Sequence, residues 1–332
     1  MRSNVRGVRF SFSGVHRLSV AVAATAIAFI ALAPVGNDVH ATTTTPNRTI
    51  SLNLLIPSMT AASTNTASQV VQALNVMVAR NPLTLTAAIQ ALVDASGASV
   101  GVSLIELGGA APLVWSFNGS AVFTAASTYK LVALMMEAQN IASGKTNPNG
   151  YVCYEDADYE DGWYDDYETG ACFTRNELAR RAGLLSDNTA GRMLVRDVGG
   201  ADAVNAWAAS LGAKESVFFT YNTTSSDDLA VVWAAEAKGS LGGSAAQAWL
   251  YPMLTGTKTE AGIPAGVASR SIVVHKTGTL DEVDNDAALV VKGPNGAYAL
   301  TVMSDGLGGA EGWQLISAIS SAVWSFEAAR AK

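Results

Sequence analysis

Hydrophobic residues recur at helical spacing in two segments before residue 96, and at strand spacing in the two segments that follow. The helical segments are 67–79 and 83–95, and Asn81-Pro82 separates them because proline cannot continue a helix. The strand-like segments are 99–107 and 111–117, with a Gly-Gly turn between them. The pattern therefore predicts two helices and then two consecutive strands.

The middle of the chain is predicted to be helical, and strands return near the C-terminus. Helical spacing begins at Ser127 and continues in Ala-rich and Leu-rich segments to about Gly239. Three strands and a final helix follow, at 271–277, 286–292, 297–304 and 312–329. The two early and three late strands can form one antiparallel sheet, which makes this an α+β protein with a helical lobe inserted into a sheet lobe. A cleft between the lobes is a natural place for a site.

The N-terminus has the pattern of a secretory signal peptide. Arg2, Arg6, Arg9 and Arg17 precede an apolar run over 18–35, and Val39-His40-Ala41 offers a small-residue cleavage site. We expect cleavage near Ala41 and a secreted or periplasmic protein, with an uncleaved anchor as the alternative. Residues 42–66, rich in Thr, Ser, Asn and Ala, are expected to form a flexible leader before a catalytic domain over 67–332.

Charge and histidine content exclude several classes of protein. The net charge is −7, and removal of residues 1–41 makes it −10 because four arginines and one aspartate leave. Such an acidic protein is a poor candidate for nucleic-acid binding. Cleavage also leaves His275 as the only histidine, so a zinc site built from several histidines is excluded. A Ser-His-Asp hydrolase would have to use His275.

Cys153 and Cys172 are the only cysteines, and in an exported protein we expect them to form a disulfide, with free thiols as the alternative. Between them lie eight acidic residues, several tyrosines and Trp163, without lysine or arginine. We expect a solvated acidic loop near the rim of the cleft. A calcium site is the alternative, although the spacing does not match an EF-hand loop.

Ser127-Thr128-Tyr129-Lys130 combines a potential nucleophile with a potential base. Residues three apart share a helix face, so the Lys130 amine can reach the Ser127 hydroxyl. A serine hydroxyl needs a neighbouring base, and lysine can act as one only if burial or nearby positive charge lowers its pKa. The start of the helix adds a positive dipole end and free N–H groups that suit an oxyanion.

Two further motifs follow in the chain. Ser186-Asp187-Asn188 precedes a helical run and, taken alone, is typical of a turn or helix N-cap. Lys276-Thr277-Gly278 closes an apolar strand and, taken alone, is a strand running into a turn. His275 is expected to point to the opposite face from Lys276 and to be structural.

Together, S-x-x-K, S-D-N and K-T-G resemble the motif set of class A β-lactamases and penicillin-binding proteins. The flanking segments FTAASTYKLVALM, LLSDNTAGRML and VVHKTGTLDEVDNDAALVV are also similar to class A enzymes, and the resemblance covers roughly residues 83–332. It implies a five-stranded antiparallel sheet with helices on both faces, in a sheet lobe over about 83–121 and 240–332. The helical lobe would occupy about 122–239.

The resemblance also implies the roles of the catalytic groups. Ser127 would attack the β-lactam carbonyl, Lys130 would act as its base, and Ser186 would relay a proton to the leaving nitrogen. No cofactor or metal is expected.

The substrate-binding roles follow from the same resemblance. Asn188 would bind the side-chain amide of the substrate, and Lys276 and Thr277 would hold its carboxylate. Gly278 belongs to the same substrate-binding strand, and Thr279 would complete the oxyanion hole with its backbone N–H. Arg270 is a weaker candidate for the carboxylate, because its spacing does not match firmly.

One departure concerns release of the acyl group. Class A enzymes carry an E-x-x-L-N loop between S-D-N and K-T-G whose Glu activates water, and we find no such motif in the 90 positions from Ser186 to Lys276. Glu215 is the nearest carboxylate and a candidate base, with an exposed loop charge as the favoured alternative. Asp227 and Asp228 are expected to begin a helix. The sequence therefore predicts acylation with slow release.

We expect a monomeric hydrolase that acts on a small β-lactam and is not inserted in the membrane after signal cleavage. The alternatives are a D,D-peptidase acting on cell-wall peptides and a non-hydrolytic penicillin-binding protein.

Overall fold

The computed structural model describes residues 38–45, 48–55, 77–219 and 221–331. The chain separates into two compact units, 1–68 and 69–332. In the first unit, β1 (Asp38–Thr45) and β2 (Arg48–Leu55) pair antiparallel. The leader predicted as flexible over 42–66 therefore contains strands where it is described, in line with its β-branched threonines. Ala41 lies in β1, and the rest of the predicted signal peptide before residue 38 is outside the described residues.

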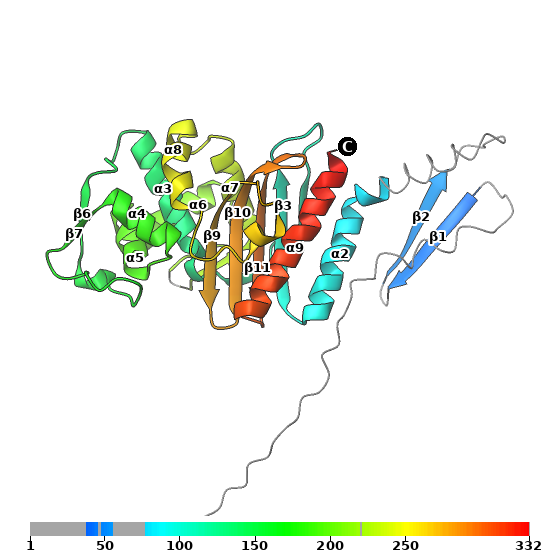
Figure 1. The fold of residues 1–332 in the computed structure, drawn as a ribbon, viewed down its shortest axis with the longest axis horizontal. Helices are drawn as coiled ribbons and strands as arrows, with labels where there is room; N and C mark the ends of the chain where they lie inside the picture. The colour runs from blue at the N-terminus through cyan, green and yellow to red at the C-terminus, as the bar shows by residue number, and fades with distance from the viewer. Residues whose placement is uncertain (1–37, 46–47, 56–76, 220, 332) are drawn as a thin grey trace, which may run out of the picture. The chain divides into compact units, whose positions relative to one another are not determined.

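The second unit is built on a five-stranded antiparallel sheet, as the sequence predicted. Its strand order is β4-β3-β11-β10-β9, so strands from the two ends of the chain meet at its centre. The strands are β3 (Ser99–Glu106), β4 (Val114–Phe117), β9 (Val273–Leu280), β10 (Val283–Gly293) and β11 (Gly296–Asp305). Strand β9 is an edge strand beside the helical lobe (Figure 1).

Helices cover both faces of this sheet. On one face lie α2 (Pro82–Ser96) and α9 (Gly309–Arg330), which run side by side in Figure 1. On the other lies α7 (Ser226–Ala237), which packs against β3, β10 and β11. Successive residues of β10 belong to different cores, because Leu289 packs with α7 and α3 whereas Val290 packs with α2 and α9.

The helical lobe lies beside the edge strand β9. It contains α3 (Tyr129–Ala142), α4 (Arg175–Leu184), α5 (Asn188–Asp197) and α6 (Gly200–Ser210). It also includes α8 (Gly243–Leu250), which packs against α3, whereas the sequence had assigned residues after 240 to the sheet lobe. Conversely, α7 covers the sheet although the sequence had assigned it to the helical lobe. The apolar pattern of a helix shows that one face is buried but not which surface buries it.

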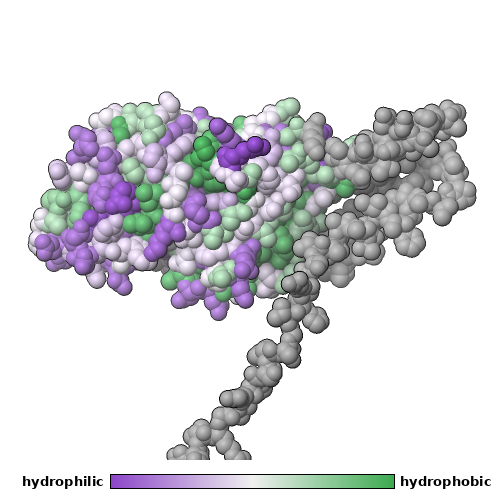
Figure 2. Space-filling model, in the orientation of Figure 1, coloured by the Kyte–Doolittle hydropathy of each residue, from purple (hydrophilic) through white to green (hydrophobic). Residues whose placement is uncertain are grey.

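The acidic loop is held by its disulfide and by arginines. Cys153 and Cys172 form the predicted disulfide between β6 (Tyr151–Cys153) and β7 (Cys172–Thr174). The loop is not merely solvated, because four of its acids pair with arginines of α4 and α5, and Glu155 shares Arg196 with Asp158. The pairs are Asp166–Arg181 at 2.6 Å, Asp158–Arg196 at 2.9 Å and Glu160–Arg192 at 3.2 Å. Figure 2 shows hydrophilic residues gathered over this part of the helical lobe.

The described residues contain no helix long and apolar enough to cross a membrane. Within the same ranges, no cluster of three or more His, Cys, Asp or Glu side chains is arranged to hold a metal ion.

Candidate active site

Ser127 lies in a 3-10 turn, η1 (Ala126–Thr128), that leads directly into α3. The preceding residue, Ala126, has φ +47°, in the left-handed region that is costly for a residue with a Cβ. Gly278 of β9 packs against this turn, and a Cβ there would lie 2.7 Å from the Ala125 carbonyl oxygen and 3.0 Å from the Ser127 nitrogen. The absence of a side chain at Gly278 therefore lets strand β9 contact the backbone at Ser127.

Lys130 is fully buried and its amine lies beside Ser127, as the motif spacing predicted. Its Nζ is 3.0 Å from Ser127 Oγ and donates to the Ser186 carbonyl and to Asn188 Oδ1, both at 2.6 Å. Burial lowers the pKa of Lys130 to about 8, although Glu160 and Asp187 oppose that shift. A lysine with this pKa is neutral in part of the population near pH 7 and can accept a proton.

Ser186 lies between two lysines. Its backbone has φ +59°, and its Oγ accepts a hydrogen bond from Lys276 Nζ at 2.9 Å. Lys130 Nζ is 3.4 Å from the same oxygen, so Ser127, Lys130, Ser186 and Lys276 form a continuous polar chain. Burial, and next the charge of Lys130, lowers the pKa of Lys276 well below its ordinary value.

Asp187 joins the acidic loop to this site. From the sequence alone, the motif that contains Asp187 was interpreted as a turn or a helix N-cap. Asp187 is fully buried and caps α5 by accepting from Ala190 N at 2.9 Å. It also accepts from Trp163 N at 2.9 Å and from Tyr167 Oη at 2.7 Å. The N-cap was readable from the sequence, but the other two donors come from a loop about twenty residues away.

Strand β9 exposes one backbone edge toward the cavity. In an antiparallel pair, alternate residues direct both backbone groups to the same side. The His275 N–H leaves the sheet to bond Leu254 O at 2.8 Å, so the N–H groups of Thr277 and Thr279 are expected to point outward as well. Both threonines line the cavity, and the oxyanion role of the Thr279 N–H stays a prediction.

These groups surround a cavity of about 260 Å³. Its lining residues are Ser127, Trp163, Gly183, Leu184, Leu185, Ser186, Asn188, Thr257, Lys258, Thr259, Lys276, Thr277 and Thr279. The sequence had not singled out Trp163, Lys258 or the threonines that flank Lys258, which carry no motif. Among the described residues, Lys258 and Lys276 line this cavity and no carboxylate does.

The fold and the motif geometry agree with comparisons to known proteins. A family model described as the beta-lactamase enzyme family matches residues 84–326, which is more than half of the chain. The chain belongs to the beta-lactamase enzyme family. The class A resemblance predicted from the three motifs is thereby confirmed.

Two Pseudomonas aeruginosa members of the family, the β-lactamases PSE-4 and CARB-3, are each 27% identical over 170 residues. This match covers 50% of the present chain and 52% of each relative, so the chain spans about half the length of these curated relatives. The structure of PBP-A superposes with a TM-score of 0.65 at 25% identity, covering 72% of this chain and 95% of that one. A β-lactamase from Sphaerobacter thermophilus gives 0.64 at 25% identity with the same coverage.

Glu215 is not brought to the site of this beta-lactamase family member. Its side chain is exposed and it is absent from the cavity lining, while its backbone N–H donates to Asp228 at 2.8 Å. Asp228 lies in the first turn of α7, as predicted. Nearby, Phe219 packs against Tyr129 with ring centroids 4.8 Å apart. The segment expected to carry a base therefore turns aromatic groups inward and Glu215 outward.

His275 lies on the opposite face of β9 from Lys276, as predicted. Its Nδ1 is 2.9 Å from Asp286 Oδ1 and its Nε2 is 3.1 Å from Glu260 Oε1. Burial alone would lower the pKa of His275, but Asp286 and Glu260 outweigh it and raise the pKa to about 9. Arg270 is exposed and does not line the cavity, so it is not positioned to bind a substrate carboxylate there.

Proposed function

We propose that this protein is an exported serine hydrolase that is acylated at Ser127 by β-lactams and releases the acyl group slowly. The observation that carries the proposal is the contact between Lys130 Nζ and Ser127 Oγ, where Ser127 lines a cavity that no described carboxylate lines. The first feature supports acylation. The second supports slow release, because the glutamate that activates the attacking water in class A enzymes has no counterpart in the lining of this cavity.

The chemistry follows from the polar chain. Ser127 Oγ forms a bond to the β-lactam carbonyl carbon while the neutral amine of Lys130 takes its proton. The carbon–nitrogen bond of the ring breaks, and the nitrogen takes the hydroxyl proton of Ser186, which recovers one from Lys130. The N–H groups of Ser127 and Thr279 stabilise the oxyanion, and Lys276 with Thr277 attracts the substrate carboxylate.

Intact-mass spectrometry of the purified protein after brief exposure to benzylpenicillin tests this scheme. We expect a mass increase of one penicillin that persists long after excess drug is removed, and no adduct in Ser127→Ala. Rapid disappearance of the adduct with steady turnover of a chromogenic cephalosporin would refute slow release. A Glu215→Gln variant is the matched control, and we expect its adduct to form and persist as in the parent.

A D,D-peptidase acting on cell-wall peptides is the second candidate. The observation that favours it is the open edge of β9, where an extended peptide can add as a strand. Its C-terminal carboxylate would meet Lys276 as the carboxylate of a β-lactam would. Release of D-alanine from a peptide ending in D-Ala-D-Ala would support this function, and absence of release with intact acylation by penicillin would exclude it.

A further inference from the structure

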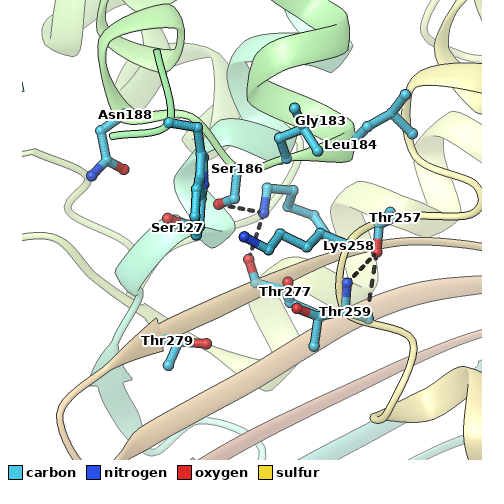
Figure 3. A pocket seen from close by; sticks show the side chains of 13 residues that line it. Ser127, Gly183, Leu184, Ser186, Asn188, Thr257, Lys258, Thr259, Thr277 and Thr279 are labelled. Atoms are coloured by element: carbon cyan, nitrogen blue, oxygen red, sulfur yellow. Dashed lines mark hydrogen bonds between the residues drawn. The ribbon is translucent and has the colours of Figure 1, made fainter. Parts of the chain in front are cut away.

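A tryptophan and a lysine from different lobes meet within the catalytic cavity. Trp163 belongs to the disulfide-closed acidic loop, and Lys258 belongs to the segment between η3 (Tyr251–Met253) and β9. Lys258 Nζ lies 2.8 Å from the centre of the Trp163 ring, and both residues line the cavity that contains Ser127. Figure 3 shows Lys258 extending across the cavity from the side of Thr257 and Thr259 toward Ser186.

Both partners are anchored by groups outside the catalytic chain. The Trp163 N–H is held by buried Asp187 at 2.9 Å. The Lys258 N–H donates to Leu184 O at 2.8 Å, and the neighbouring Thr257 hydroxyl lies 3.2 Å from His275 Nε2. Hydrogen bonds to the rest of the fold therefore hold the backbone on both sides of the contact between Trp163 and Lys258.

We propose that Trp163 and Lys258 form a cation–π latch that narrows the cavity and must open before a substrate reaches Ser127. The proposal rests on the proposed function, because it concerns entry to the same site. Lys258 and Trp163 touch no catalytic group by any hydrogen bond of the described residues, so opening the latch leaves the acylation machinery intact. The pair consequently determines which substrates enter, and it disfavours those with bulky side chains.

A double-mutant cycle tests the latch. Lys258→Met, Trp163→Leu and the double variant are compared with the parent by the second-order rate of acylation with benzylpenicillin. Exposed cation–π pairs are weak, so each single substitution is expected to raise the rate about two- to fivefold. The double variant should be no faster than the faster single variant, because the latch is already open. Additive effects, unchanged rates or lower rates would each overturn the proposal.

Acrylamide quenching of tryptophan fluorescence tests the contact between Lys258 and Trp163 and does not require acylation. All seven tryptophans lie in the described residues, and Trp163 is the only exposed one, at 57%. Replacing the Lys258 ammonium by the uncharged Met side chain removes the cation–π attraction that holds it over one face of the ring, so Lys258→Met is expected to show stronger quenching than the parent. Lys238→Met, an exposed lysine outside the cavity, is the matched control and should not change it.

The two experiments separate this inference from the proposed function. If the parent protein forms no adduct, the proposed function fails, and the quenching comparison still decides whether the latch exists. If the adduct forms and quenching of Lys258→Met equals that of the parent, the latch is refuted while the proposed function stands.

Discussion

At the scale of single residues, the burial of Lys130 decides how Ser127 can react. An exposed lysine is charged at neutral pH and cannot accept a proton, whereas the pKa of Lys130 is lowered to about 8. Its amine also donates hydrogen bonds to Ser186 O and Asn188 Oδ1, and these bonds orient the amine toward Ser127. Position and basicity therefore come from the same enclosed environment.

We predict that acylation of Ser127 accelerates as the pH rises through about 8. The neutral form of Lys130 is the active one, so below this value the rate should rise up to tenfold per pH unit and then level off. The second-order rate of adduct formation between pH 6 and 10 measures this. Lys130→Met should lower the rate by about 10²- to 10⁴-fold. A pH-independent parent rate would contradict a role for Lys130 as base.

Gly278 offers a second test at this scale. In Gly278→Ala the new methyl group would lie 2.7 Å from the Ala125 carbonyl oxygen, so η1 and β9 must move apart. We expect a loss of about 1–3 kcal/mol in the free energy of unfolding and a slower acylation of Ser127. Urea denaturation and adduct formation measure the two effects. Thr279→Ala keeps the backbone N–H and serves as control, with acylation retained.

At the scale of elements, the acidic loop is a strap that connects α4 and α5 to the catalytic cavity. Its ends are joined by the disulfide, its acids bind Arg181, Arg192 and Arg196, and its centre reaches Asp187. The disulfide chiefly restricts the unfolded chain, whereas the ion pairs and hydrogen bonds act in the folded state. The two kinds of restraint should therefore be separable by experiment.

We predict that Cys153→Ser/Cys172→Ser lowers stability but preserves acylation. Closing a loop of this length contributes about 3 kcal/mol by restricting the unfolded chain. Thermal melting with and without reductant should show the loss in the parent and no further effect of reductant in the variant. Acylation measured well below the melting temperature should change less than about threefold. Complete loss of acylation in a folded variant would show that the disulfide itself positions the site.

At the scale of the whole second unit, His275 joins the edge of the sheet to the segment that carries Lys258. It bonds Asp286 of β10 on one side and Glu260 with Thr257 on the other. Asp286 also accepts from Ile263 N at 2.9 Å, so the charged imidazole lies inside a network of fixed partners. This network lies on the opposite face of β9 from Lys276, and the charge of Asp286 opposes the lowering of the pKa of Lys276.

We predict that His275 makes the protein less stable at high pH. Its pKa is about 9 in the folded protein, above the ordinary value of 6.5, so its contribution is complete below pH 6.5. The contribution is lost as the pH rises through about 9, and it amounts at most to about 3 kcal/mol. A comparison of urea unfolding between the parent and His275→Gln from pH 6 to 10 separates the contribution of His275 from that of other titrating groups. The difference in free energy between the two proteins should shrink with rising pH, and a constant difference would contradict the prediction.

Much of the fold was predictable because the sequence patterns that indicate its strands and helices are local. The strands β3, β9, β10 and β11 have apolar patterns that the sequence identified, and α2 begins at the proline that separated two helical segments. The lobe boundaries were less accurate at α7 and α8. Amphipathic spacing indicates which face of a helix is buried. The element that covers this face depends on the path of the rest of the chain.

The sequence by itself determined the pairing of Ser127 with Lys130, because residues three positions apart are neighbours on any helix. It also determined the disulfide pairing, since only two cysteines were available. Only the tertiary structure decided that Glu215 faces away from the cavity and that Trp163 meets Lys258 within it. These relations join segments far apart in the chain, so they depend on how the sheet and the helices pack against one another. The same packing buries Lys130 and lowers its pKa, as its proposed role as base requires.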